Sequence, residues 1–119
     1  MLDRAPQENG TLDYCHENGI GFISFSPLAQ GLLTDRYLNG IPADSRMAKE
    51  HFLKHSALTP ELLEQLKQWN AEAAERGETL AEMALAWILH QKGVTSVLVG
   101  ASSTAQLEKN MKCVHAKAF

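Results

Sequence analysis

The chain has 119 residues, of which 45% are hydrophobic and 21% are charged, a composition typical of one modest soluble globular domain. Its formal net charge of −3 argues against nucleic acid or an anionic membrane surface as a partner, because both attract basic proteins. The longest apolar run is too short to span a bilayer, and the stretch MLDRAPQENG lacks the apolar core of a secretory signal.

The first part of the chain predicts a loop, a helix and a strand, in that order. Residues 1–10 are rich in turn formers and are predicted to be a loop. A short helix is predicted over Thr11–Glu17, with Thr11 as its N-cap and an Asn-Gly pair closing it. The apolar run at residues 21–25 predicts a strand that follows after a short connection.

Residues 26–58 show no clear periodicity and contain two prolines and two glycines. Irregular segments of this length are uncommon inside compact domains and are usually functional or disordered. The local sequence LLTDRYL predicts one helical turn within this segment. We therefore expect residues 26–58 to be a long loop that is either functional or disordered.

Two helices are predicted after this loop. The first begins at Thr59-Pro60 and ends at Gly77, with an apolar stripe at helical spacing formed by Leu62, Leu66, Trp69 and Ala73. The second covers residues 80–90 and is apolar over most of its circumference, so it needs cover on more than one side.

The chain ends with a predicted strand and a predicted helix. Residues 94–99 are rich in β-branched side chains and predict a buried strand. The last helix is expected to begin near Ser103 or Thr104, with a core stripe of Leu107, Met111 and Val114. The overall order predicts an α/β fold with a parallel pair of strands. Because two parallel strands leave open edges, the chain is expected to be a piece of something larger or to self-associate.

Two predicted strand ends carry the polar residues that suit a ligand. After residues 94–99, Gly100 permits close approach of a backbone, and the hydroxyls of Ser102 and its neighbours surround the first turn of a helix, which suits phosphate. Gln106 and Asn110 share one face of that helix. Ordinary helix capping explains the same serines, and that alternative is favoured on spacing alone.

After residues 21–25, the sequence SPLAQG places Ser26, Gln30 and Gly31 at the end of the first strand, where α/β folds bind ligands. Arg36 and Arg46 follow in the same loop, and arginine pairs with phosphate in a bidentate manner. No histidine spacing indicates a metal site, and the cysteines, Cys15 and Cys113, have no metal-ligand spacing around them. We expect two reduced thiols in a cytoplasmic protein, with a disulfide between them left open.

Three stretches occur together in a way that resembles one family. The stretches GFISFSPLAQGLLTDRYLNGIPADSR, TLAEMALAWILH and VTSVLVGASSTAQLEKN are similar to the C-terminal third of an aldo/keto reductase. The motifs SPLAxGxLTxxY, GIPxxSR and GASxxxQLxxN follow one another with the separations of the branch that contains potassium-channel β subunits and bacterial glyceraldehyde-3-phosphate reductases. The resemblance covers about residues 1–110.

This resemblance implies a (β/α)8 TIM barrel, of which residues 1–119 would supply the last two βα units only, as an incomplete C-terminal part of the domain. It also implies an oxidoreductase that uses NADP(H) to reduce small aldehydes or ketones. The positions that would bind the cofactor are Ser26, Leu28, Gln30, Gly31, Arg36, Arg46, Gly100, Ser102, Gln106 and Asn110.

The resemblance also implies what this chain does not carry. The family's catalytic Asp, Tyr, Lys and His come from earlier strands, and Tyr14 and Tyr37 do not match the motif of the tyrosine. Ser103 and Lys109 depart from the usual residues at the adenosine end, so the choice between NADPH and NADH stays open. We expect the chain to be inactive alone, and the alternative is a non-enzymatic truncated product or a piece that docks onto the rest of a barrel.

Overall fold

The computed structural model describes residues 1–41, 43 and 55–119. The chain divides into two compact units, one formed by Met1–Pro27 with Glu82–Phe119 and the other by Leu28–Ala81. In the part of the chain that the structure describes, no helix has the length and apolar character needed to cross a membrane.

The unit that contains both chain termini begins with two short helices, α1 (Ala5–Glu8) and α2 (Thr11–Glu17). The prediction of a loop over residues 1–10 is therefore wrong for α1, which has a proline in its first turn, where the missing N–H is not needed. The N-cap of α2 is Gly10, with φ of +83°, and not Thr11 as predicted. The Oδ1 of Asn9 instead accepts hydrogen bonds from the backbone N–H and the hydroxyl of Thr11.

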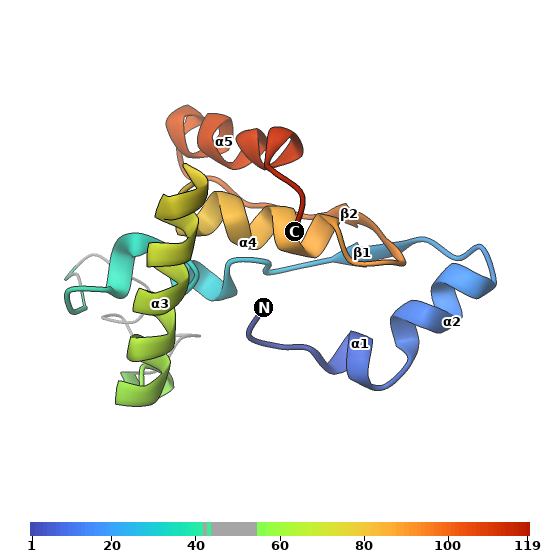
Figure 1. Cartoon of the computed structure of the whole chain (residues 1–119), viewed down its shortest axis with the longest axis horizontal. Coiled ribbons are helices and arrows are strands. Elements are labelled where there is room, and N and C mark those ends of the chain that lie inside the picture. The colour runs from blue at the N-terminus through green and yellow to red at the C-terminus, as the bar shows by residue number, and fades with distance from the viewer. Residues whose placement is uncertain (42, 44–54) are drawn as a thin grey trace. The chain divides into compact units, whose positions relative to one another are not determined.

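Two strands form the sheet of this unit. β1 (Phe22–Ser24) and β2 (Val94–Val97) pair in parallel, as the order of elements predicted, and Figure 1 shows the two arrows side by side. The register pairs Ile23 with Ser96 and Ser24 with Val97, with an irregularity just before Ile23. The strand over residues 94–99 was predicted to be buried, but Thr95 and Ser96 are exposed and Leu98, just beyond β2, is 63% exposed.

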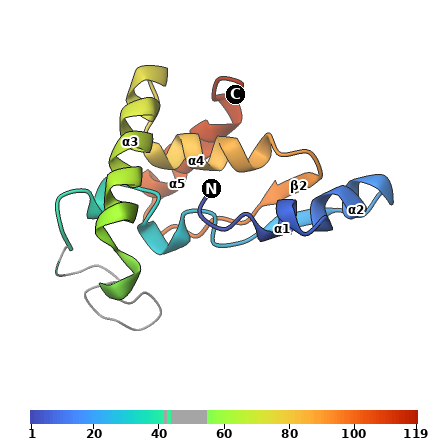
Figure 2. The ribbon, with the colours of Figure 1, turned by 60° about the horizontal axis from the view of Figure 1, so that its bottom comes forward.

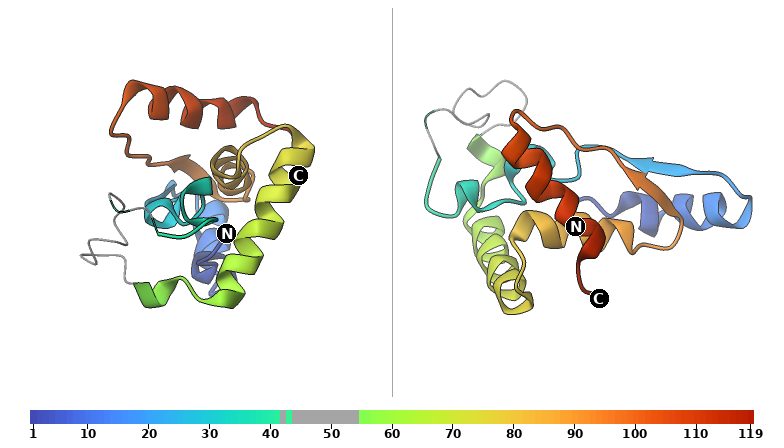
Figure 3. Two further views of the ribbon diagram at one scale, coloured as in Figure 1. Left: turned by 90° about the vertical axis from the view of Figure 1, so that its left-hand side faces the viewer. Right: turned by 90° about the horizontal axis from the view of Figure 1, so that it is seen from above.

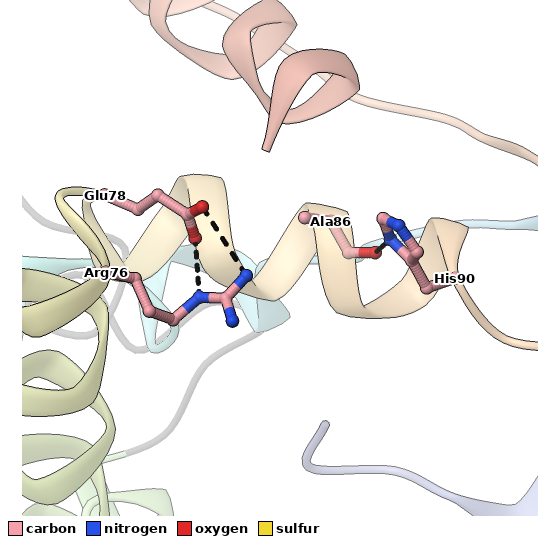
Figure 4. A network of polar contacts seen from close by, with 4 residues as sticks. All are labelled: Arg76, Glu78, Ala86 and His90. Atoms are coloured by element: carbon pink, nitrogen blue, oxygen red, sulfur yellow. Dashed lines mark hydrogen bonds and ion pairs between the residues drawn. The ribbon is translucent and has the colours of Figure 1, made fainter. Parts of the chain in front are cut away.

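Helix α4 (Leu80–Leu89) precedes β2 and supplies much of the buried side-chain surface. Its buried residues point in several directions around the helix, which confirms the predicted need for cover on more than one side: Leu80, Met83, Ala84, Leu85, Ala86 and Ile88. At its C-terminal end, the Nδ1 of His90 lies 2.8 Å from the carbonyl oxygen of Ala86 (Figure 4). The ring of Phe119 packs edge-on against His90, with centroids 5.7 Å apart.

The N-terminal segment contacts the end of α4 and the turn after it. The guanidinium of Arg4 lies over the ring of Trp87, 5.7 Å from its centroid. The side-chain amide of Gln7 donates a hydrogen bond to Oε1 of Gln91. Gly93, with φ of +94°, is so close to α2 that an added Cβ would lie 2.6 Å from the carbonyl oxygen of Leu12. These contacts fix the end of the sheet at which β2 begins.

Helix α5 (Thr104–Met111) follows β2 and continues into the 3₁₀ turn η4 (Lys112–His115). The predicted core stripe of this segment is not buried: Leu107, Met111 and Val114 are 42%, 61% and 66% exposed. Only Cys113 of α5 and η4 is buried. The stripe has the correct spacing for a helix face, but nothing in the described part of the chain covers it.

In its described residues, 28–41, 43 and 55–81, the second unit has three 3₁₀ turns and one long helix, which Figures 2 and 3 show. The turns are η1 (Ala29–Gly31), η2 (Asp35–Tyr37) and η3 (His55–Ala57), and η2 confirms the helical turn predicted in LLTDRYL. The helix is α3 (Pro60–Arg76). Its predicted limits are confirmed, because Thr59 Oγ1 accepts a hydrogen bond from the Leu62 N–H at 3.1 Å and Gly77 adopts a left-handed conformation.

The core of the second unit contains Leu33, Tyr37 and Leu66, each no more than 1% exposed. At the end of α3, its last residue Arg76 forms an ion pair with Glu78, with Nε 3.0 Å from Oε2 (Figure 4). Because the two side chains flank the left-handed glycine that ends the helix, this pair holds the turn that leads out of α3.

Candidate functional site

The carboxyl ends of β1 and β2 lie at the same edge of the sheet. The strands are parallel, and the hydrogen-bonded ladder reaches beyond them, since the N–H of Leu98 donates to the carbonyl oxygen of Ser24 at 2.8 Å. Ser26 and Gly100 therefore both leave the sheet at this edge, and both are exposed. In parallel α/β sheets the carboxyl edge is where ligands bind.

The turn after β2 is held by hydrogen bonds from its backbone and side chains to the side chains of Ser103 and Gln106. Ser103 is the N-cap of α5, and its Oγ accepts a hydrogen bond from the N–H of Gln106 at 3.2 Å. The Oε1 of Gln106 accepts in return from the N–H and the hydroxyl of Ser102, each at 2.8 Å. This reciprocal arrangement is close to a capping box. The capping explanation considered for these residues therefore accounts for Ser103 and for part of Gln106.

Gly100 has no neighbours that explain why it is glycine. An added Cβ at this position would meet nothing within 4 Å, and its φ lies outside the left-handed region. Asn110, one turn beyond Gln106 on α5, is half-buried. The space beside the Gly100 backbone is therefore open at the same edge as Ser26, Ser102 and Gln106.

The segment after β1 adopts an unusual backbone. Among the described residues, the non-glycine residues with positive φ are Ser26, Ala29 and Gln30, with φ of 48°, 49° and 58°. This conformation costs about 1–2 kcal/mol for a residue other than glycine, and such residues cluster at binding sites and switch regions. Gly31 follows with φ of +98°, where a Cβ would lie 3.4 Å from the Tyr37 ring.

Sequence reasoning missed the hydrogen bonds of Thr34 in this segment. Its hydroxyl donates to the carbonyl oxygen of Gly31 at 2.6 Å and accepts from the N–H of Arg36 at 3.2 Å, so that it caps η2. A threonine directly before the turn was the available signal. The left-handed residues had no signal in the sequence, because none of them is glycine.

The predicted site residues fall into two groups. Ser26, Gly100, Ser102, Gln106 and Asn110 belong to the unit that contains the sheet, and the parallel pairing brings the two strand ends together. The others, Leu28, Gln30, Gly31 and Arg36, belong to the unit Leu28–Ala81, and Arg46 lies outside the described residues.

Both Cys15 and Cys113 are free thiols. Burial raises the pKa of the Cys113 thiol, and the charge of Glu82 adds to this effect. Within residues 1–41, 43 and 55–119, there is no group of three or more His, Cys, Asp or Glu side chains that could hold a metal ion.

Comparisons with known proteins give a consistent result. The model of the aldo/keto reductase family matches residues 1–118. An L-glyceraldehyde 3-phosphate reductase of Escherichia coli O157:H7 is 48% identical over 124 residues, which cover 100% of this chain and 36% of that protein. A probable voltage-gated potassium channel subunit beta of Arabidopsis thaliana is 38% identical, covering 96% of this chain and 36% of that protein.

A third relative is an NADH-specific methylglyoxal reductase of Escherichia coli K12, 36% identical over 97% of this chain and 35% of that protein. The chain therefore spans about a third of the length of these curated relatives. A crystal structure of a thermostable aldo-keto reductase superposes with a TM-score of 0.65 at 22% identity, covering 99% of this chain and 32% of that one. This structural likeness concerns the fold alone.

Proposed function

Because the chain belongs to the aldo/keto reductase family, we propose that it carries part of the NADP(H)-binding site of a reductase for small aldehydes or ketones. The observation that carries this proposal is the common edge at which Ser26 and Gly100 leave the paired strands. The reductases among its relatives are named for glyceraldehyde 3-phosphate and methylglyoxal, and both compounds are small carbonyls. Reduction of a small carbonyl compound is therefore the proposed reaction of the parent enzyme.

The adenosine end of the cofactor is the part that this chain would hold. The first turn of α5 offers backbone N–H groups and the positive end of a helix dipole, which favour a phosphate or ribose oxygen. In the chain alone, the N–H and the hydroxyl of Ser102 donate hydrogen bonds to Oε1 of Gln106. An oxygen of the ligand would replace Oε1 as the acceptor of one of these hydrogen bonds. The released amide of Gln106, with Asn110 one turn away, could then bind the adenine and ribose.

The remaining cofactor positions rest on the family resemblance. Leu28, Gln30 and Gly31 would run along the pyrophosphate, in a segment whose left-handed backbone favours a ligand-binding role. Arg36, which is exposed, and Arg46 would contact phosphate. One relative is named as NADH-specific, so the preference for NADP(H) is the part of the proposal that a titration with both cofactors must decide.

The chain by itself would not complete a reaction. In our proposal it supplies the last two βα units of a (β/α)8 barrel, and the hydride of the cofactor and the proton from a tyrosine meet at residues that it does not contain. Of the tyrosines in the chain, Tyr37 is 1% exposed and Tyr14 lies on α2, before the sheet. The two free thiols are in keeping with the cytoplasmic location that we propose.

A second candidate function is that of a non-enzymatic piece of a barrel that docks onto a partner. The exposed sheet face favours it, since Ile23 and Phe25 are 63% and 77% exposed. Binding of a dinucleotide separates the two candidates, because a docking piece has no need to retain it.

The proposal is tested by titrating the ¹⁵N-labelled chain with NADPH and, separately, with NADH while recording amide chemical shifts. We expect weak binding, with shifts concentrated at Ser26, Gly100, Ser102 and Gln106. Gly100→Ala should weaken binding at least about tenfold, because its methyl group would fill the space that the ligand backbone approaches. Shifts spread over other regions, or none at millimolar cofactor, would contradict the proposal.

The matched control is Gly21→Ala. Gly21 also has an ordinary φ, and its added Cβ would make only a 3.5 Å contact with Thr95, but it lies before β1, at the other end of the sheet. The variant should bind the cofactor as the unmodified chain does. Addition of glyceraldehyde or methylglyoxal should produce no loss of NADPH absorbance with the purified chain, and any loss would refute the expected inactivity.

A further inference from the structure

Thr34 lies between two segments of the proposed cofactor site. The 3₁₀ turn η1 comes before it, and the turn η2, which contains Arg36, comes directly after it. By the family resemblance, Gln30 and Gly31 would run along the pyrophosphate of the cofactor and Arg36 would contact phosphate. Thr34 itself is not among the predicted cofactor-binding residues, and its side chain is half-buried.

The backbone of η1 has a conformation that its own residues do not favour. Ala29 and Gln30 have φ of 49° and 58°, in the left-handed region that residues with a Cβ rarely adopt. Such a conformation persists only where the surrounding structure over-determines it. Contacts from neighbouring residues must therefore hold η1 in place.

Backbone hydrogen bonds hold the first part of this turn. The carbonyl oxygen of Leu28 accepts from the N–H groups of Gly31 and Leu33, at 3.0 and 3.1 Å. The carbonyl oxygen of Ala29 accepts from the N–H of Leu32 at 3.2 Å. These bonds use the carbonyl groups at the start of the turn, whereas the carbonyl group of Gly31, at its end, is bound by a side chain.

That side chain is Thr34. Its hydroxyl donates to the carbonyl oxygen of Gly31 at 2.6 Å and accepts from the N–H of Arg36 at 3.2 Å. One hydroxyl group therefore joins the last residue of η1 to the middle of η2. The ring of Tyr37, which is 1% exposed, also lies close, since an added Cβ at Gly31 would be 3.4 Å from it. Gly31 is thus held by a hydrogen bond and by a buried ring.

We propose that Thr34 is a positioning residue for the cofactor: its hydroxyl holds Gly31 and the left-handed residues before it in the conformation that binds the pyrophosphate. This inference rests on the proposed function, because it assigns a role within the same cofactor site. A ligand binds only the competent fraction of a loop, so its apparent dissociation constant rises as that fraction falls. Loss of one hydrogen bond changes such an equilibrium by about fivefold.

The test compares NADPH with adenosine 2′-phosphate, which lacks the pyrophosphate, in titrations of the full ¹⁵N-labelled chain. Thr34→Val removes the hydroxyl and keeps the branched shape of the side chain. It should raise the dissociation constant of NADPH about fivefold. The dissociation constant of adenosine 2′-phosphate should not change, because this fragment has no pyrophosphate to contact η1. Thr34→Ser retains the hydroxyl and should bind NADPH as the unmodified chain does.

Thr59→Val is the matched control. Thr59 belongs to the same unit, and its Oγ1 accepts a hydrogen bond from the N–H of Leu62, so the same substitution removes a threonine cap at the start of α3. It should lower the free energy of unfolding, measured by urea denaturation, and leave NADPH binding unchanged. If the hydroxyl of Thr34 were merely structural, Thr34→Val would show the same pattern as this control.

Hydrogen exchange of the unmodified chain gives a readout that needs no substitution. The N–H of Arg36 is bound to Oγ1 of Thr34, so it exchanges when this hydrogen bond opens. A ligand that binds only the closed loop makes that opening rarer. NADPH at about ten times its dissociation constant should therefore slow the exchange of this amide about tenfold, whereas adenosine 2′-phosphate should not slow it.

Three results would overturn the proposal. Equal binding of NADPH by Thr34→Val and the unmodified chain would limit Thr34 to a structural role and leave the proposed function standing. The same holds if Thr34→Ser binds NADPH as weakly as Thr34→Val, because the hydroxyl is then not responsible. If neither NADPH nor NADH binds the unmodified chain, the proposed function fails, and the role of Thr34 fails with it.

Discussion

The two ends of the β1–β2 pair are built in different ways. At the amino end, backbone and side chains are in close contact: Gly93 lies against the carbonyl of Leu12, and the N–H of Phe22 donates to the hydroxyl of Thr95 at 3.1 Å. At the carboxyl end, Ser26 and Gly100 are exposed, and a Cβ at Gly100 would touch nothing. One end is fixed by packing and the other is left open.

This difference follows the division of labour in parallel α/β folds. Residues at the amino end of the strands contribute stability, while the loops at the carboxyl end hold ligands. Glycine is therefore present at each end of the strand pair for a different physical reason. Gly93 is required by a close approach within the chain, whereas Gly100 leaves room for something outside it.

Gly93→Ala, at the amino end of the β1–β2 pair, should have the largest effect on the free energy of unfolding. The substitution requires a left-handed alanine, which costs about 1–2 kcal/mol, and it forces a Cβ to within 2.6 Å of the Leu12 carbonyl oxygen, an overpacking that typically costs about 1–3 kcal/mol. We expect a loss of unfolding free energy of about 3 kcal/mol, measured by urea denaturation.

Gly19→Ala separates the cost of a left-handed alanine from the cost of the close contact with Leu12. Gly19 also has a positive φ, of +65°, but an added Cβ would meet nothing within 4 Å. Only the backbone term remains, so we expect a loss of about 1–2 kcal/mol. Equal effects of the two substitutions would show that the contact between Gly93 and α2 does not stabilise this end.

Ser103→Ala, at the carboxyl end of the β1–β2 pair, should have an intermediate effect on the free energy of unfolding. It removes the oxygen that accepts the Gln106 N–H at the start of α5, and loss of such a cap costs about 1 kcal/mol. Thr104→Ala, at the exposed first position of the same helix, should change stability by less than about 0.5 kcal/mol. If both changes are neutral, the hydrogen bonds of this turn do not order it.

The pH dependence of the unfolding free energy tests whether the turn η4, which follows α5, is packed through its buried residue Cys113. Cys113 is the buried residue of η4, and its pKa is raised from the ordinary value of 9.0, first by burial. A thiol that stays protonated in the folded state stabilises it fully below pH 9, and this contribution is lost as pH rises through the folded-state pKa.

The measurement is the difference in unfolding free energy between the unmodified chain and Cys113→Ala at several pH values. The difference cancels the ionisation of other groups, and we expect it to shrink as the pH rises above 9. A difference that stays constant would mean that Cys113 is not buried in solution.

Gly100→Ala should have the smallest effect on stability. Its added Cβ has nothing within 4 Å and no unfavourable φ, so the unfolding free energy should change by less than about 0.5 kcal/mol. Together with the weaker cofactor binding expected above, this result would complete the contrast with Gly93. A large loss of stability would instead give Gly100 a role in the fold.

Local signals in the sequence were sufficient for several elements. The limits of α3 followed from Thr59-Pro60 and Gly77, because a cap and a left-handed glycine act within a few residues of the helix end. The start of α5 near Ser103 or Thr104 and the parallel order of β1 and β2 were also predicted correctly, since α5 begins at Thr104 with Ser103 as its N-cap. The motifs around SPLAQG and GASS pointed to the family that the family model matches.

The sequence by itself thus determined where α3 begins and ends, the direction of the strands and the family, because each depends on neighbouring residues or on a pattern of motifs. Only the tertiary structure decided which apolar stripe is buried: Leu66 and Ala73 of α3 are buried, whereas Met111 and Val114, with equally regular spacing, are exposed. Periodicity shows which face of an element is apolar, but burial also requires a neighbour, and that neighbour lies far away in sequence or on another polypeptide.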